Sequence, residues 1–285
     1  MPRLVHILIV ALAVGACPSV ALGQNSQTSQ QSPVPSDASG TEGRRAFAWW
    51  LEDADVLEAR TAILGISVGR WQGIGGGQTD GPVLDANYGL TDFLQVSLSL
   101  PYYWAKDDSG FQAHGRGDSY LAAKFRLLDA SESPVGIAIS PTLEVLSDAA
   151  ISDASLQLKR VNWALPVSVQ IGSSGTRAYV SFGYFSRGAA FVGGAIERSL
   201  TERLTVSATF NFTRSMHTLA SSTLEVLSRN RFDATIGGSV MIAPRVGAYV
   251  SVGRTISTLD ENGARFCVGA GLSVTLGGSQ APQVK

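Results

Sequence analysis

The stretch Leu204-Thr-Val-Ser-Ala-Thr-Phe-Asn-Phe-Thr213 decides the fold class. Every second residue from Leu204 to Phe212 is apolar, and the residues between them are Thr, Ser or Asn. Successive side chains of a β-strand point to opposite faces, whereas a helix would scatter these apolar residues around its axis. The stretch is therefore predicted to be a β-strand with one apolar and one polar face.

The same alternation recurs along the chain, in Leu94–Leu100, Val161–Ile171 and Phe266–Leu276. Several of these runs reach about 10–13 residues, the length of a tilted strand that crosses a bilayer, whereas soluble strands average about 5–6. Their polar faces carry Ser, Thr, Gly, Asn and Gln rather than Lys and Glu. This pattern predicts an all-β fold, a transmembrane antiparallel up-and-down β-barrel with its apolar face toward lipid.

The connections alternate in length, as expected for short periplasmic turns and longer outer loops. The short ones are Leu90–Phe93, Asp129–Pro134, Gly172–Gly175, Leu200–Arg203 and Ala243–Arg245. The longer ones are Gln72–Gly81, Ala105–Gly115, Ser147–Ser155, Met216–Asn230 and Ser257–Gly263, with a tight outer turn near Arg187–Ala189 as the exception. This spacing predicts about twelve strands. The first runs from Leu57 to Trp71, and its apolar face slips near Leu64.

Composition agrees with a membrane barrel and excludes several other classes. Charged residues make up 16% of the chain, below the roughly 25% that is usual in soluble domains, and glycine is abundant at 31 residues. The 22 basic and 23 acidic residues leave no basic excess, so no nucleic-acid partner is expected. The His, Cys, Asp and Glu residues show no metal-ligand spacing, so the chain is expected to use no metal and no other cofactor.

The N-terminus predicts export. Arg3 precedes an apolar stretch from Leu4 to Ala16, and Ala21-Leu22-Gly23 places small residues before a cut at Gln24. This is the layout of a cleaved signal peptide. A lipoprotein box ending at Cys17 is the alternative. The expected location is the outer membrane of a Gram-negative-type bacterial envelope.

Four segments are therefore expected. Residues 1–23 form the signal peptide, 24–54 a disordered periplasmic lead with a short Trp-containing segment, 55–277 the barrel and 278–285 a flexible tail. The lead is rich in Gln, Ser and Pro and too poor in apolar residues to offset its ordering entropy. Trp49 and Trp50 would either anchor at the periplasmic interface or pack a short helix against the barrel mouth.

Strand alternation also predicts which charged and aromatic residues line the interior. The candidates are Asp85, Asp118, Tyr120, Lys124, Arg126, Glu144, Arg160, Glu197 and Asp233. Their mixed signs favour a polar pore with tuned selectivity, and the alternative is that they pair across the lumen and fill it. Tyr103 and Tyr120 would point inward and flank an aromatic solute.

Catalytic signals are sparse. Apart from His6 in the signal, the histidines are His114 and His217, both in expected outer loops. Met216-His217-Thr218, with Ser221 nearby, is the best candidate for a lipid-modifying hydrolase, and a solvated loop histidine is the alternative. No catalytic residue is assigned. A structural or adhesion barrel that works through its loops is a third possibility.

One stretch carries a resemblance to a known family. Tyr88-Gly-Leu-Thr-Asp-Phe-Leu-Gln-Val-Ser-Leu-Ser-Leu-Pro-Tyr102 is followed by Gly115-Arg-Gly-Asp-Ser-Tyr-Leu-Ala-Ala-Lys-Phe-Arg-Leu-Leu128. These motifs resemble those of an outer-membrane transporter family labelled as putative meta-pathway phenol-degradation proteins, with Phe125 in place of the usual Tyr. The resemblance covers about forty residues and implies a channel for small, hydrophobic or aromatic compounds.

The leading hypothesis is a non-enzymatic outer-membrane channel that passes small solutes by diffusion, in either direction. Its expected partners are membrane lipid, a small-molecule solute and the barrel-assembly machinery.

Overall fold

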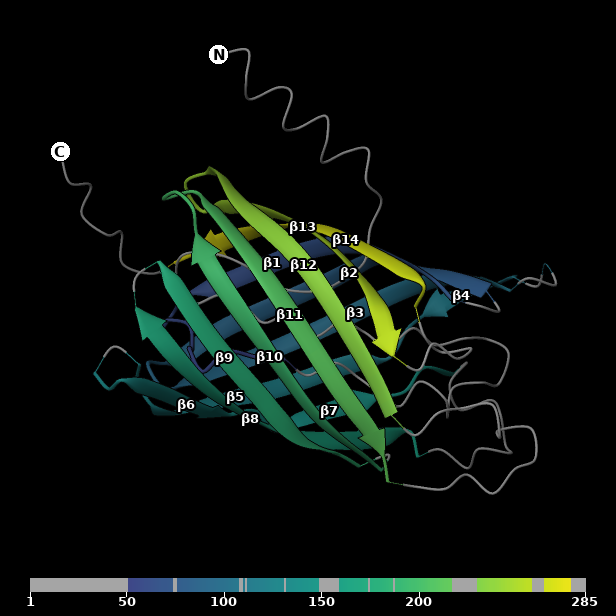
Figure 1. The fold of residues 1–285 in the computed structure, drawn as a ribbon, viewed down its shortest axis with the longest axis horizontal. Helices are drawn as coiled ribbons and strands as arrows, with labels where there is room; N and C mark the ends of the chain where they lie inside the picture. Colours follow the sequence, from purple (N-terminus) through teal and green to yellow (C-terminus); the bar gives the residue numbers. More distant parts are fainter. Residues whose placement is uncertain are drawn as a thin grey trace, which may run out of the picture.

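The computed structural model describes residues 51–73, 76–107, 110, 112–130, 132–148, 159–173, 175–186, 188–216, 230–257 and 264–277. Their strands form one closed antiparallel barrel (Figure 1). The strands are β1 (Ala62–Gln72), β2 (Gly76–Thr91), β3 (Leu94–Asp107), β4 (Gln112–Arg116), β5 (Ser119–Leu128), β6 (Val135–Ile139), β7 (Thr142–Val145), β8 (Val161–Ser173), β9 (Thr176–Phe185), β10 (Ala189–Ser199), β11 (Leu204–Ser215), β12 (Asn230–Ala243), β13 (Val246–Ser257) and β14 (Phe266–Leu276). Within these ranges, none of the residues forms a helix long and apolar enough to span a membrane.

The fourteen strand segments occupy twelve positions in the wall. β4 and β5 both pair with β3, so they are two parts of one wall position, interrupted at Gly117 and Asp118. β6 and β7 both lie between β5 and β8, and the break between them falls at Ser140 and Pro141, where proline offers no N–H to the ladder. β1 pairs with β14 from Ala62↔Leu276 onward and closes the cylinder. The prediction of a twelve-stranded antiparallel barrel is confirmed.

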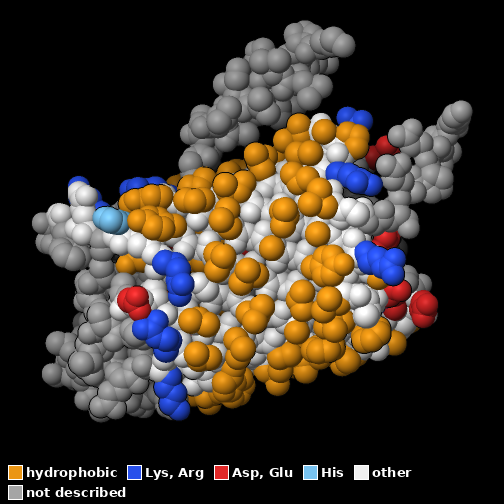
Figure 2. Space-filling model, turned by 180° about the vertical axis from the view of Figure 1, so that it is seen from behind, with side chains coloured by type: hydrophobic (Ala, Val, Ile, Leu, Met, Phe, Trp, Pro, Cys, Tyr) orange, Lys and Arg blue, Asp and Glu red, His pale blue; other side chains and the backbone are white. Residues whose placement is uncertain are grey.

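The two faces of the wall are inverted relative to a soluble protein. On β11, Phe210 and Phe212 point outward and are 44% and 37% exposed, whereas Thr209, Asn211 and Thr213 face inward and are at most 7% exposed. Hydrophobic side chains cover the outer surface between the two ends of the barrel (Figure 2). This arrangement suits a wall with lipid outside and polar groups inside.

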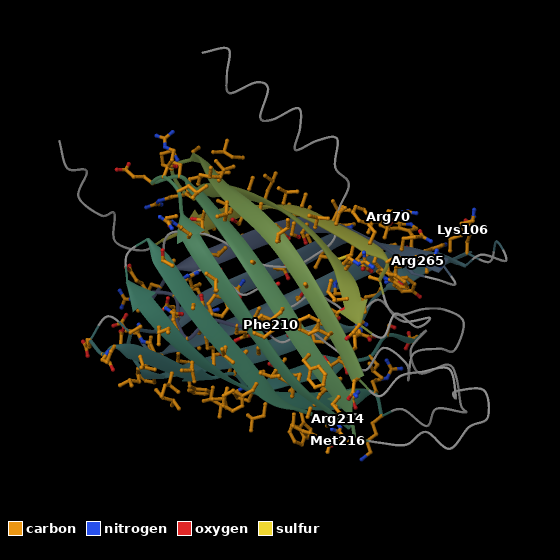
Figure 3. The ribbon with its side chains drawn as sticks, viewed as in Figure 1. Arg70, Lys106, Phe210, Arg214, Met216 and Arg265 are labelled. Atoms are coloured by element: carbon orange, nitrogen blue, oxygen red, sulfur yellow. The ribbon has the colours of Figure 1, made fainter. Side chains whose placement is uncertain are left out.

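Aromatic and basic side chains mark the end of the barrel with the longer connections. Tyr102 and Trp104 lie on the outer face of β3 with ring centroids 4.8 Å apart, and Trp163 and Tyr184 form a second pair at 6.0 Å. Arg70, Lys106 and Arg265 lie at the same end (Figure 3). Aromatic rings at the lipid headgroup level with cationic side chains beyond them are typical of a membrane interface.

Two boundaries differ from the sequence prediction. β1 begins at Ala62 and not at Leu57, because the chain turns into the barrel at Glu58–Thr61, where Arg60 has a positive φ of 63°. The apparent slip near Leu64 has a simple cause: Ile63 faces inward and Leu64 outward, so two apolar neighbours lie on opposite faces of a regular strand.

The second difference concerns the expected loops Gln72–Gly81 and Ala105–Gly115. β2 and β3 continue their ladder through these stretches to the pair Gly76↔Asp107, and β4 adds to the edge of β3. The pairing extends past the wall as a projecting hairpin (Figure 1). Glycine and polar residues in these stretches suggest loops in the sequence, but their backbone groups pair as strands in the structure.

The inversion of the faces predicts a depth-dependent cost for charge on the outer surface. Phe210 lies midway along β11, and Met216 follows the end of this strand (Figure 3). Phe210→Arg should destabilise the folded barrel by about 2–4 kcal/mol, whereas Met216→Arg should cost only about 0–1 kcal/mol. Equilibrium urea unfolding in lipid vesicles measures both, and equal costs at the two depths would contradict the assigned membrane position.

Candidate functional site: the polar lumen and the segment inside it

The described residues directly before β1, from residue 51 onward, lie inside the barrel. We call Leu51–Arg60 the lumen segment. It leaves the wall through the turn at Arg60, where the Thr61 amide donates to the carbonyl of Glu58 at 3.1 Å. Glu52, Asp53, Ala54, Val56 and Leu57 are each at most 4% exposed. The segment is therefore part of the barrel interior at the end with the short turns.

Backbone amides of the lumen segment donate hydrogen bonds to side chains on both sides of the wall. The Leu57 amide donates to Gln95 Oε1 of β3 at 3.0 Å, and the Ala54 amide donates to Gln170 Oε1 of β8 at 3.1 Å. The Glu52 amide donates to Ser181 Oγ of β9 at 3.3 Å. Because β1 and β9 lie on opposite sides of the twelve-position wall, the segment crosses the lumen.

Two bases of the wall, the buried Lys124 and the partly buried Arg177, pair with the acidic side chains of the lumen segment. Lys124 Nζ of β5 lies 2.9 Å from Asp53 Oδ1 and 3.7 Å from Glu52 Oε2, and it donates to the carbonyl of Asp55 at 3.0 Å. Arg177 Nη1 of β9 lies 3.3 Å from Asp53 Oδ2 and 3.1 Å from Asp55 Oδ2. Buried charges are stable only when they are paired in this way.

The wall completes the network on both sides. Arg177 Nε pairs with Glu197 of β10, whose other carboxylate oxygen accepts a hydrogen bond from Tyr179 at 2.9 Å. Gln170 Nε2 donates to Asp55 Oδ2 at 2.9 Å. Burial and the neighbouring Asp53 carboxylate raise the pKa of Asp55, while Gln170 and Arg177 oppose the shift. Docking of the segment therefore favours the protonated form of this carboxyl more than water does.

Two glycines make room for the lumen segment. A Cβ on Gly89 of β2 would lie 2.2 Å from the carbonyl oxygen of Glu58, so only glycine fits at this position. A Cβ on Gly136 of β6 would lie 3.3 Å from the Cβ of Ala54 and 3.0 Å from that of Ala130. The backbone of the wall is thus shaped to accept the segment.

The motifs that carry the family resemblance form much of this docking site. In Tyr88-Gly-Leu-Thr-Asp92, Gly89 gives the close approach, and Asp92 Oδ1 accepts from the Ala59 amide at 3.2 Å. In the second motif, Lys124 binds the segment and Arg126 donates to the carbonyl of Asp92. Several residues of the two motifs thus contact the lumen segment or one another.

The other half of the lumen contains an aromatic cluster and further carboxylates. Tyr120, Phe185 and Phe191 pack together with Ala164 and Ala189, and the Tyr120 hydroxyl donates to Glu144 Oε1 at 3.2 Å. Asp118 Oδ1 accepts from the Ser147 amide at 2.8 Å. Asp233 is paired with Arg231 at 2.8 Å and accepts from the Thr255 hydroxyl at 2.6 Å.

Seven of the nine candidates from the sequence face the interior: Asp85, which lies opposite Ser99 of β3, and Asp118, Tyr120, Lys124, Glu144, Glu197 and Asp233. Arg126 lies at the short-turn rim, where it also pairs with Asp129 at 2.7 Å. Arg160 comes before β8, its side chain is 49% exposed, and it pairs with the exposed Asp148. These two residues lie at the rims because their strand positions fall near or beyond the strand ends.

Sequence reasoning missed several residues of the network. The inward position of Arg177 and Tyr179 could have been predicted from the sequence. Val180, Phe182 and Tyr184 define the outer face of β9, so the residues that alternate with them face inward. Glu52, Asp53 and Asp55 have no such signal, since their acidic stretch lacks strand periodicity. Only its position just before the first strand distinguishes it.

The structure does not describe the candidate hydrolase residues. His217 and Ser221 lie outside the described residues, as does Arg187 of the tight turn. His114 is exposed on β4, with its Nδ1 3.1 Å from the Tyr102 hydroxyl. Among the described side chains, no three His, Cys, Asp or Glu residues gather as a metal site.

The comparisons with known proteins show the fold. No protein-family model matches the chain, and no curated protein matches it, so the resemblance to the phenol-degradation family is not confirmed. Three solved structures are similar. The KdgM porin has a TM-score of 0.51 at 10% identity, over 75% of this chain and 99% of its own. The NanC porin has a TM-score of 0.53 at 10% identity, over 75% of this chain and 100% of its own. An outer membrane channel from Pseudomonas putida F1 has a TM-score of 0.55 at 12% identity, over 80% of this chain and 100% of its own.

Replacement of Lys124 by methionine tests whether the ion pairs hold the lumen segment. Lys124→Met leaves buried carboxylates without their ammonium partner, which should cost docking about 3 kcal/mol. Amide hydrogen exchange at Ala54 and Leu57 should therefore speed up by about a hundredfold. Arg160→Met, which breaks an exposed pair, is the control and should leave both amides unchanged. Full protection of Ala54 in Lys124→Met would show that the Lys124 ion pairs do not hold the segment.

Proposed function

We propose that the chain forms a passive channel for small solutes in a bacterial outer membrane. The observation that carries the proposal is the inversion of the closed wall, apolar outside and polar and charged inside. A barrel of this type pairs all backbone groups of its wall between strands, and it offers polar contacts to a solute in its lumen. The similarity in fold to two porins and a channel supports the same role.

The interior charges support a selective passage. Carboxylates and bases of both signs face inward from several strands, among them Asp85, Lys124, Arg177 and Glu197. Charged side chains that line a pore set which solutes enter and how fast they leave. The lumen segment crosses the lumen at its short-turn end, so a solute would have to pass it there.

The aromatic cluster supports aromatic compounds as one class of solute. Tyr103 is 2% exposed, and the rings of Tyr120, Phe185 and Phe191 are buried within the barrel. Aromatic rings favour offset or edge contacts with other rings, and a phenolic hydroxyl adds a polar partner. A small aromatic solute would meet both features on its way through the lumen.

The route to the membrane is part of the proposal. A signal peptide over residues 1–23 would direct export, and the barrel-assembly machinery would insert the mature chain into the outer membrane. Residues 1–50 lie outside the described part of the chain. Membrane lipid would contact the outward apolar side chains.

Conductance of the refolded mature chain in a planar bilayer tests this function. Discrete current steps in KCl are expected. Phenol should reduce the step size more than cyclohexanol does, because only phenol presents an aromatic face to the cluster. Tyr120→Leu should remove this difference, whereas Tyr102→Leu, on the outer face of β3, should preserve it.

The outcomes separate the two parts of the proposal. A correctly folded barrel that passes no current and no solute would contradict the channel. Steps that respond equally to phenol and cyclohexanol would contradict the aromatic class alone and leave the channel in place.

A further inference from the structure

We propose that the short-turn end of the lumen contains a binding site for small organic carboxylates, and that acidic side chains of the lumen segment occupy it in this structure. The inference rests on the proposed channel function and specifies a solute class for it. The site consists of Lys124, Arg177 and Gln170, with Gln95 and Ser181 beside them.

Lys124 shows that this part of the wall requires an anion. Its side chain is 3% exposed, and across the described residues the hydrogen bonds and ion pairs of Nζ all go to the lumen segment. An ammonium group buried without an anion is strongly unfavourable. When the segment leaves, another anion must replace it or water must enter.

The bound carboxylates show the geometry that the site accepts. The two oxygens of Asp53 bridge the bases, with Oδ1 2.9 Å from Lys124 Nζ and Oδ2 3.3 Å from Arg177 Nη1. Asp55 Oδ2 lies beside it, 3.1 Å from Arg177 Nη1 and 2.9 Å from Gln170 Nε2. Two carboxylates of the segment therefore share the Arg177 guanidinium with Glu197 of the wall, and a guanidinium is a planar donor suited to such groups. A small dicarboxylate offers the same pair of charges.

The neutral groups around the bases suit a replaceable occupant. Gln95, Gln170 and Ser181 accept hydrogen bonds from backbone amides of the segment. Amide and hydroxyl side chains are also donors, so the same groups can turn to a carboxylate once the peptide has gone. The site thus retains partners for a solute after the segment has left.

The tether sets how strongly the segment competes. A short flexible linker holds its ligand at an effective concentration in the millimolar range. The segment is joined to β1 through Arg60 and Thr61, so it competes with any free carboxylate. Removal of its charges at Glu52 and Asp53 should increase the apparent affinity for a free dicarboxylate at least tenfold.

The test uses the full mature chain, with succinate as the probe and putrescine as a cation of similar length. Glu52→Gln/Asp53→Asn keeps the segment but removes the charges that pair with Lys124. Binding is measured by calorimetry on the folded protein in detergent, and block of KCl current is measured in a bilayer. Succinate should bind this variant at least tenfold more tightly than the wild type, and putrescine should show no such gain. Addition of Lys124→Met should abolish the gain.

Each result is decisive. Equal succinate affinity in the wild type and the double variant, or a gain that persists with Lys124→Met, would overturn the site. A gain seen by calorimetry in a barrel that carries no current would support the site and contradict the channel. Current without any succinate effect would contradict the site alone. Heat-modifiable gel migration shows that each variant is folded.

Discussion

The structure depends on one constraint: backbone N–H and C=O groups cannot remain unpaired in hydrocarbon. An open sheet would expose two edges to lipid, so the β1–β14 pairing that closes the wall is obligatory. Closure in turn forces the side-chain inversion, since one face of every strand must meet lipid and the other must meet the lumen. Interruptions of the ladder at Gly117 and Pro141 are tolerated because neighbouring strands continue across them.

Once the wall is closed, its interior has to satisfy its own charges. Asp233 has Arg231 as a partner on its own strand, and Glu197 has Arg177 on the adjacent one. Lys124 is different, because its anions come from outside the wall. The lumen segment is therefore not an accessory to a finished barrel: it supplies charges without which the wall would contain a buried, unpaired ammonium.

The sequence predicted what depends on strand periodicity and missed what depends on a single backbone torsion. Alternation along β11 and its neighbours predicts the strand number and the inward face, and the structure places Lys124, Glu144 and Glu197 on that face. Leu57 was placed in the wall because an apolar residue before a strand fits the pattern in either location. The turn at Arg60 decides between them, and a positive φ at arginine has no signature in the sequence. The need for glycine at position 89 becomes evident only when the nearby carbonyl of Glu58 is known.

The contacts of the lumen segment also bear on the order of assembly. Its partners are far away along the chain: Ser181 is 129 residues from Glu52, and Arg177 is 122 residues from Asp55. No partial sheet of the first strands presents both Lys124 and Arg177, so the segment can dock only after β8 and β9 have joined the wall. Docking is then a late step, and it is sensitive to strand number, since a cylinder with a strand missing would set these bases at the wrong spacing. The lumen segment can therefore dock fully only in a barrel whose later strands are in place.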